Sequence, residues 1–264
     1  MAKEKKGKII TVTSMKGGVG KTIFTLLLAS VYENLGKKVL IIDLDLHAGD
    51  IAFCLNAEIL GTIYNVCDDM NNNRYRSITS SDYLCHYDDF IDILAAPKDP
   101  RYASKVDKRC LDLLLGSISN YYDVVLIDTN HLLDIYNMLA FEYSNKIVDI
   151  FTNDSMDLKS TKTFVSICRN VDVDNYCIVL NESIRKDKTY FSEYSVKSFL
   201  GRDIDYFIPS NLSIQDIDQD IMDSKLFKNM LSLNKKSKKT YESLANFALS
   251  LLSDAERGTL NEKE

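Results

Sequence analysis

The residues with the clearest chemical potential stand together near the start of the chain. Residues 14–22 read Ser-Met-Lys-Gly-Gly-Val-Gly-Lys-Thr, which combines three glycines, two lysines and two hydroxyl side chains. Glycines let backbone N–H groups turn toward phosphate oxygens without a Cβ in the way, and the N-terminus of a following helix adds partial positive charge. A lysine at the end of such a loop reaches the β- and γ-phosphates of a nucleotide, and the next hydroxyl ligates Mg²⁺. We therefore predict a phosphate loop, with Lys21 on the phosphates and Thr22 on the metal.

Carboxylates follow two later apolar runs of the chain. The run 39–45 reads Val-Leu-Ile-Ile-Asp-Leu-Asp, and the run 122–128 ends Val-Val-Leu-Ile-Asp. Ligands of open α/β sheets bind at the carboxyl ends of the strands, so Asp43, Asp45 and Asp128 are expected on the side of the phosphate loop. Asp128 has the position of a Walker B aspartate, which holds Mg²⁺, commonly through a water. For Asp43, a metal-linked role and a structural role are equally reasonable.

The surrounding elements alternate between strand and helix. The apolar run 9–12 is short and β-branched, as a buried parallel strand should be, and the run 23–35 has helical spacing that ends near Gly36. Two short helices separated by a turn at 71–73 are expected in 57–87. Further expected strands are 90–97, 146–152, 176–180 and 205–208, and further expected helices are 105–121, 156–171, 190–200 and 241–252. This alternation predicts a three-layer, doubly wound α/β fold with a mainly parallel sheet.

Composition sets limits on the class of protein. The chain has 264 residues, is 45% apolar and carries a net charge of −6. We expect one domain over 8–252, between a basic tail (1–7) and a polar tail (253–264), because no Gly/Ser/Pro-rich linker divides the chain. The acidic balance argues against a surface broadly adhesive to nucleic acid. The six cysteines lack metal-ligand spacing and predict free buried thiols. No signal peptide or membrane-spanning run stands out, which favours a cytoplasmic protein.

The phosphate loop departs from the ordinary pattern in one informative way. Met15 stands where the ordinary loop has its first glycine, and a second lysine, Lys16, follows it. The string Lys-Gly-Gly-Val-Gly-Lys-Thr resembles the deviant Walker A motif of the MinD/ParA family of dimerising ATPases, which are P-loop NTPases of the SIMIBI type. The resemblance implies ATP and Mg²⁺ as ligands and a homodimer with ATP between its subunits. It also implies that Lys16 crosses to the partner's nucleotide and that Asp45 orients or activates the attacking water.

The resemblance extends to the nucleotide contacts. In the family, an Asn after a strand meets the adenine and an Ile-Pro segment lies beside it; here these are Asn181 and Pro209. Ile23 stands where relatives place Ser or Thr, so one hydrogen bond to the α-phosphate is lost. A segment like 97–106 borders the dimer face in the family. The nucleotide-contacting residues implied by the loop and by the resemblance are Gly17, Gly18, Val19, Gly20, Lys21, Thr22, Ile23, Asn181 and Pro209.

Three functions within this framework remain open. The stretch Asp43-Leu44-Asp45-Leu46-x-x-Gly49-Asp50 is similar to the CpaE/TadZ pilus-assembly branch, which implies a protein partner in a pilus or secretion machine and recruitment to a polar or membrane-associated complex. A DNA-partition ATPase is the second hypothesis, with the lysine-rich cluster 234–239 as its candidate contact. The third is a dimeric scaffold that binds ATP with little hydrolysis. It is favoured by Ile23 and by Asn130-His131, since the switch II segment after Asp128 lacks the family's Pro and Gly.

Overall fold

A computed structural model of the chain describes residues 6–184, 191–210 and 235–253, and its central feature is an eight-stranded sheet. The strands are β1 (Lys8–Thr13), β2 (Val39–Asp43), β3 (Cys85–His86), β4 (Ile91–Leu94), β5 (Val124–Asp128), β6 (Lys146–Phe151), β7 (Tyr176–Asn181) and β8 (Tyr206–Ile208). Their order in space is β3-β4-β2-β5-β1-β6-β7-β8. All described pairs are parallel except β3 with β4. The predicted mainly parallel, doubly wound sheet is confirmed.

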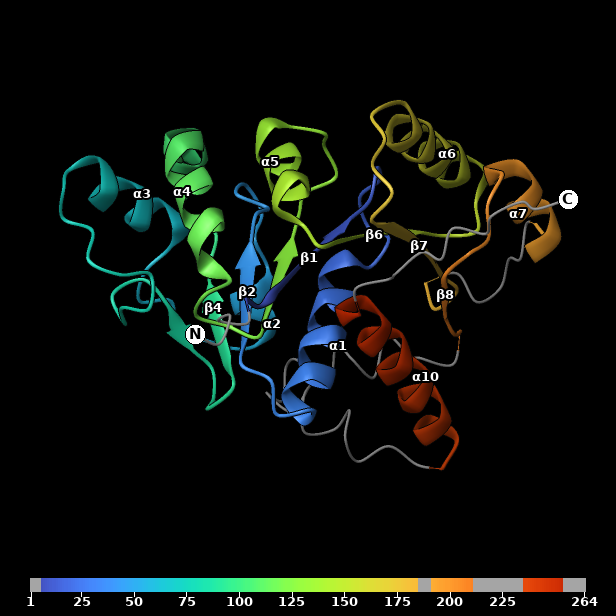
Figure 1. Cartoon of the computed structure of the whole chain (residues 1–264), viewed down its shortest axis with the longest axis horizontal. Helices are drawn as coiled ribbons and strands as arrows, with labels where there is room; N and C mark the ends of the chain where they lie inside the picture. Colours follow the sequence, from blue (N-terminus) through green and yellow to red (C-terminus); the bar gives the residue numbers. More distant parts are fainter. Residues whose placement is uncertain (1–5, 185–190, 211–234, 254–264) are drawn as a thin grey trace, which may run out of the picture.

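Helices cover both faces of the sheet, which gives three layers (Figure 1). One face is covered by α1 (Lys21–Asn34), the short α2 (Ile51–Cys54) and α10 (Lys235–Leu252). The other face carries α3 (Ile63–Asn71), α4 (Lys108–Ile118), α5 (Ile135–Tyr143), α6 (Ser155–Asn170) and α7 (Glu193–Leu200). Because each central strand is buried on both faces, its sequence is almost uniformly apolar rather than alternating.

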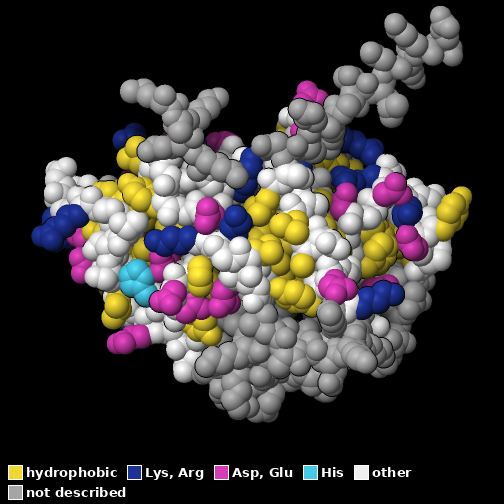
Figure 2. Space-filling view, turned by 60° about the horizontal axis from the view of Figure 1, so that its bottom comes forward, with side chains coloured by type: hydrophobic (Ala, Val, Ile, Leu, Met, Phe, Trp, Pro, Cys, Tyr) yellow, Lys and Arg dark blue, Asp and Glu magenta, His cyan; other side chains and the backbone are white. Residues whose placement is uncertain are grey.

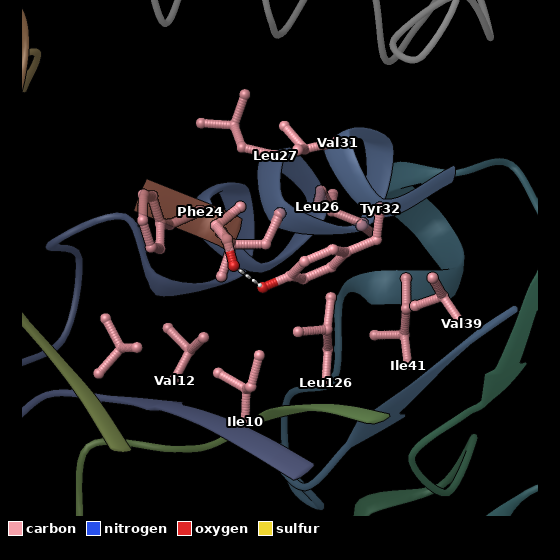
Figure 3. Packing of buried hydrophobic residues seen from close by; sticks show 14 of the residues in the cluster. Ile10, Val12, Phe24, Leu26, Leu27, Val31, Tyr32, Val39, Ile41 and Leu126 are labelled. Atoms are coloured by element: carbon pink, nitrogen blue, oxygen red, sulfur yellow. Dashed lines mark hydrogen bonds between the residues drawn. The ribbon is translucent and has the colours of Figure 1, made fainter. Parts of the chain in front are cut away.

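The packing between β1, β2, β5 and α1 fixes the base of the phosphate loop. Figure 3 shows Ile10, Val12 and Leu126 of the sheet below α1, with Phe24 at the start of that helix and Leu27 on its side away from the strands. All five side chains are at most 2% exposed. Burying a side chain of this size stabilises the fold by about 1.5–3 kcal/mol. The first turn of α1 is therefore held firmly against the sheet.

A hydrogen bond joins the two helices of this layer. The Tyr32 hydroxyl of α1 donates to the Ala248 carbonyl of α10 at 2.8 Å, as the dashed line in Figure 3 indicates. Burial raises the pKa of Tyr32, so this hydroxyl keeps its proton and remains a donor. The contact ties the last helix to the helix that begins at the phosphate loop.

The register of the sheet brings the predicted chemical residues to one edge. Val12 of β1 and Asp43 of β2 both lie opposite Asp128 of β5. The loop that follows β1 and the carboxylates that end β2 and β5 therefore meet at the carboxyl edge of the sheet, as a doubly wound topology requires. Asp45 lies beyond the end of β2, in the following loop.

Some local predictions were wrong. The helix expected from residue 105 begins at Lys108, because the Asp107 carboxylate accepts a hydrogen bond from Arg109 N and caps it there; a 3₁₀ turn, Pro100–Lys105, precedes it. A second short helix within 57–87 does not form after α3; the described chain makes turns and the edge strand β3 instead. The last helix begins at Lys235 rather than at 241.

The cysteines, the search for membrane-spanning helices and the two tails can also be compared with the sequence-based expectations. All six cysteines are free and buried, as the sequence predicted. Within the part of the chain that the structure describes, none of the helices is long and apolar enough to cross a membrane. Most of both predicted tails, residues 1–5 and 254–264, lies outside the described residues.

Candidate active site

The phosphate loop spans residues 14–20, between the end of β1 and the start of α1. Gly18 and Gly20 have φ of +73° and +94°, in the left-handed region that favours glycine. A Cβ on Gly20 would also lie 2.7 Å from Asn181 Nδ2, so both the backbone and the space require glycine there. Val19 is 2% exposed and anchors the loop in the core. The loop geometry predicted from its glycines is therefore present.

Thr22 and Asp128 meet at the mouth of this loop. Thr22 Oγ1 donates to Asp128 Oδ2 at 2.7 Å, and Thr25 Oγ1, one turn further along α1, donates to Asp128 Oδ1 at 3.3 Å. Burial raises the pKa of Asp128 to about 6, while the Thr22 hydrogen bond and the charge of Lys21 lower it. A hydroxyl beside a carboxylate is an all-oxygen donor set of the kind that Mg²⁺ prefers, so these residues fit the metal that the loop implies.

Thr25 did not feature among the sequence-based site residues. The signal for it was its spacing of three residues from Thr22, which places both hydroxyls on one face of the helix. In the structure its hydroxyl lies 3.1 Å from Lys21 O and 3.3 Å from the second oxygen of Asp128, so its single proton is shared between these two acceptors.

Lys21 begins α1 and lies largely buried, with 9% of its surface exposed. Burial lowers the pKa of Lys21, whereas the charges of Asp128 and Asp45 act to raise it. A cation in such a partly desolvated place attracts an anion more strongly than it would in water. The position suits a lysine that binds phosphate.

Asp43 organises the loop that leads to Asp45. Asp43 is 2% exposed, and its two oxygens accept hydrogen bonds from Asp45 N at 3.2 Å and from Ile51 N at 3.1 Å. Burial raises the pKa of Asp43 well above its usual value, and the neighbouring Asp128 adds to the effect. A Cβ on Gly49 would come within 2.7 Å of Asp43 Oδ2, so the loop can pass this close only with glycine. These contacts are those of a structural aspartate, and its metal-linked role stays a prediction.

Asp45 is half-buried in the same loop, where its Oδ1 accepts from Ala48 N at 3.2 Å. Its charge acts on both Lys21 and Asp128, so it belongs to the same electrostatic site. Its role toward the attacking water stays a prediction.

Lys16 makes an ion pair within its own chain. Its Nζ lies 2.8 Å from Asp154 Oδ2, with 33% of the lysine side chain exposed and 10% of the aspartate side chain. Asp154 is the N-cap of α6, since its Oδ1 accepts from Met156 N and Asp157 N. Asp154 was not foreseen from the sequence, where the only signal was an acidic residue just after an apolar strand.

Asn181 and Pro209 lie at the same edge as the phosphate loop. Asn181 Nδ2 donates to Val19 O at 2.9 Å, and Asn181 Oδ1 accepts from the Ser183 backbone N–H and hydroxyl. Asn181 therefore braces the loop directly. Pro209 follows Ile208, which pairs with Asn181 across β7 and β8. Their expected contacts with adenine stay predictions.

Ile23 lies in the first turn of α1, where it is half-buried and packs against the core beneath that helix. Its expected place among the nucleotide contacts stays a prediction.

The chain is similar to known proteins over most of its length. A family model described as an AAA domain matches residues 7–175. A protein of Emiliania huxleyi assigned as the septum site-determining protein MinD is 23% identical over 198 residues, which cover 74% of this chain and 71% of the relative.

Solved structures share the fold. A ParA family ATPase from Chlorobium tepidum superimposes with a TM-score of 0.79 at 15% identity, covering 92% of this chain and 98% of the other. MinD from Pyrococcus horikoshii in complex with Mg-ADP gives a TM-score of 0.73 at 20% identity, covering 93% and 96% of the two chains. At such low identities the structural match shows the fold alone. The family match covers the phosphate loop, the strand ends that carry Asp43 and Asp128, and Asp154.

Proposed function

Because the chain belongs to the MinD/ParA family of P-loop ATPases, we propose that it binds ATP with Mg²⁺, dimerises around the nucleotide and hydrolyses it. The observation that carries this proposal is the 2.7 Å hydrogen bond between Thr22 Oγ1 and Asp128 Oδ2 at the mouth of a glycine loop. It brings a Walker A hydroxyl and a Walker B carboxylate together from positions far apart in the chain. Support for the nucleotide also comes from the Mg-ADP bound to the similar MinD structure.

Each residue of the site has a role in this proposal. The loop N–H groups and Lys21 hold the phosphates, while the oxygens of Thr22 and Asp128 hold Mg²⁺, which neutralises charge on the β- and γ-phosphates. Asp45 orients the attacking water and takes up its proton, as the water oxygen bonds to the γ-phosphorus and the bond to the leaving ADP oxygen breaks. Lys16 leaves Asp154 and supplies positive charge to the nucleotide of the partner subunit. Hydrolysis then releases the two subunits.

ATP turnover by the purified protein tests the enzyme. We expect slow hydrolysis that falls by about 100-fold in Asp45→Ala, the usual scale for losing a residue that handles the attacking group's proton, with ATP binding retained. Lys21→Ala, which removes a phosphate contact, is the control for loss of binding. Turnover that is unchanged in Asp45→Ala would contradict the assigned role. ATP-dependent dimers without turnover in the wild type would instead establish the scaffold alternative.

For the cellular role we propose a spatial switch that positions a protein machine, with a pilus or secretion apparatus as the first candidate. This rests on the stretch Asp43-Leu44-Asp45-Leu46-x-x-Gly49-Asp50 and on the acidic balance of the chain. Figure 2 looks toward the side where α1 and α10 lie and shows Lys/Arg and Asp/Glu interspersed around hydrophobic side chains outside its grey region. Such a mixed surface suits a protein partner better than the phosphate backbone of DNA.

DNA partition is the second candidate, favoured by the similarity to a ParA family ATPase. Its sequence-based contact, the cluster 234–239, falls at the start of α10, and residue 234 lies outside the described residues. This role predicts ATP-dependent DNA binding that weakens with salt and is lost when Lys235, Lys236, Lys238 and Lys239 are neutralised together. No binding at low salt would remove this candidate.

A further inference from the structure

The switch II segment after β5 is locked by side-chain hydrogen bonds. Asn130 Oδ1 accepts from Leu132 N at 2.7 Å and from Asn137 Nδ2 at 2.9 Å, and Asn130 Nδ2 donates to Asp134 Oδ2 at 2.8 Å. Asp134 Oδ1 in turn accepts from Tyr136 N and Asn137 N, and so caps α5. These bonds hold the turn in one conformation although the segment contains neither proline nor glycine. The turn 130–134 is consequently a braced unit joined directly to α5.

His131 stands at the exposed side of this braced turn. Among the described residues, no hydrogen bond or ion pair occupies its ring. The ring lies against the phosphate loop, since a Cβ built on Gly17 would be 3.8 Å from His131 Nδ1 and 4.0 Å from His131 Cγ. Gly17 directly follows Lys16. An imidazole with its hydrogen-bonding capacity unused therefore borders the loop that binds phosphate.

We propose that His131 contacts the terminal phosphate of ATP and thereby couples the γ-phosphate to switch II. The proposal rests on the proposed ATP binding and assigns a ligand to a residue that the mechanism above does not use. Neutral imidazole offers one N–H donor and imidazolium offers two, so either form can donate to a phosphate oxygen beside Gly17. ADP has no γ-phosphate to accept that hydrogen bond.

The braced turn connects the proposed phosphate contact to α5. Because Asn130 and Asp134 connect the backbone on both sides of His131 to the start of α5, a change in the position of the ring is passed to that helix. The first turns of α5 and the residues before it present exposed apolar side chains, namely Leu132 at 55%, Ile135 at 53% and Met138 at 41% exposure. His131 thus links the phosphate loop to a surface whose placement depends on the nucleotide.

Calorimetric titration with ADP and with AMPPNP, each with Mg²⁺, tests the proposal on four proteins. These are the wild type, His131→Ala, His131→Gln and the control His47→Ala, which removes an exposed histidine in the loop after β2. We expect His131→Ala to bind AMPPNP about tenfold more weakly, equivalent to about 1.4 kcal/mol, with ADP affinity unchanged. The amide N–H of His131→Gln should restore most of the loss, and His47→Ala should behave as the wild type.

The possible failures are distinguishable. Equal losses for ADP and AMPPNP in His131→Ala, or no loss for either, would overturn the role of His131 while nucleotide binding stands. A wild type that binds neither nucleotide would overturn the proposed function itself.

Discussion

The Lys16 ammonium lies 2.8 Å from the Asp154 carboxylate, so the second lysine of the phosphate loop is paired with the cap of α6 in its own chain. One carboxylate thus has two tasks, because its other oxygen caps the helix. The Lys16 side chain is one-third exposed, and an ion pair at such a site contributes little to stability because solvent screens it. The cap and the ion pair can therefore be separated by substitution.

Removing the cap should cost more stability than removing the ion pair. We expect Asp154→Ala to lower the free energy of unfolding by about 1–2 kcal/mol, whereas Asp154→Asn, which keeps a capping oxygen, and Lys16→Ala should each lower it by less than about 1 kcal/mol. Urea unfolding followed by circular dichroism measures all three. If Lys16→Ala were as destabilising as Asp154→Ala, the ion pair would be the main stabilising contact.

The buried carboxyl of Asp149 in β6 should lower the free energy of unfolding at neutral pH. It is fully buried between the sheet and α6, and no hydrogen bond of standard geometry reaches either carboxylate oxygen from the described residues. Burial raises the pKa of Asp149 well above its usual value, and Asp157 adds to this, while Thr161 and Lys21 act more weakly in the opposite direction. The folded chain therefore binds a proton that the unfolded chain releases above about pH 4.

The proton bound by Asp149 makes the stability of the fold depend on pH. Between the unfolded and folded pKa of Asp149, the folded state binds more protons, so stability falls as pH rises. Asp149→Asn removes that loss, and its stabilisation should be larger at pH 8 than at pH 5, reaching about 1–3 kcal/mol. Asp157→Ala is the control: Asp157 Oδ2 accepts from Thr152 N and Oγ1, both at 2.7 Å, and alanine removes that acceptor, so this change should destabilise. Destabilisation by Asp149→Asn at both pH values would contradict the account.

Much of the site could be predicted because it depends on local pattern and on topology. Glycines at 18 and 20 require a left-handed backbone wherever the chain goes, and parallel strands deliver Asp43 and Asp128 to one edge. Asp154 could not be predicted as the partner of Lys16, because that contact depends on how the loop before α6 packs beside a loop distant in sequence. The hydrogen bond from Asn181 to Val19 O could not be predicted either, because it depends on where the end of β7 lies relative to the phosphate loop.

The wrong helix boundaries have a similar cause. Apolar spacing extends through 105–121, yet Asp107 caps the helix two residues later than the periodicity begins. In 73–87 the chain has too little periodic apolar surface to hold a helix against the sheet, and Cys85 and His86 pair with β4 instead. In both places the tertiary neighbours and the side-chain caps decide the structure, and helical spacing alone does not contain them.

The effect of Mg²⁺ on nucleotide affinity should depend on Asp128. Nucleotide affinity in the wild type should rise with Mg²⁺, because the proposed metal site uses the adjacent oxygens of Thr22 and Asp128 as ligands. In Asp128→Asn this gain should shrink by about tenfold, equivalent to about 1.4 kcal/mol, while affinity measured in EDTA should change little. Titration of a fluorescent ADP analogue with and without Mg²⁺ measures both. An undiminished Mg²⁺ effect in Asp128→Asn would place the metal on other residues.

The central claim is that ATP joins two copies of this chain and that Lys16 acts across the interface. Light scattering coupled to size-exclusion chromatography tests it, with the wild type and Lys16→Ala each run in ADP and in ATP with Mg²⁺. We expect a dimer only for the wild type in ATP, and monomers in the other three samples. Monomers throughout, despite measured ATP binding, would contradict the account and leave a simple P-loop nucleotide binder.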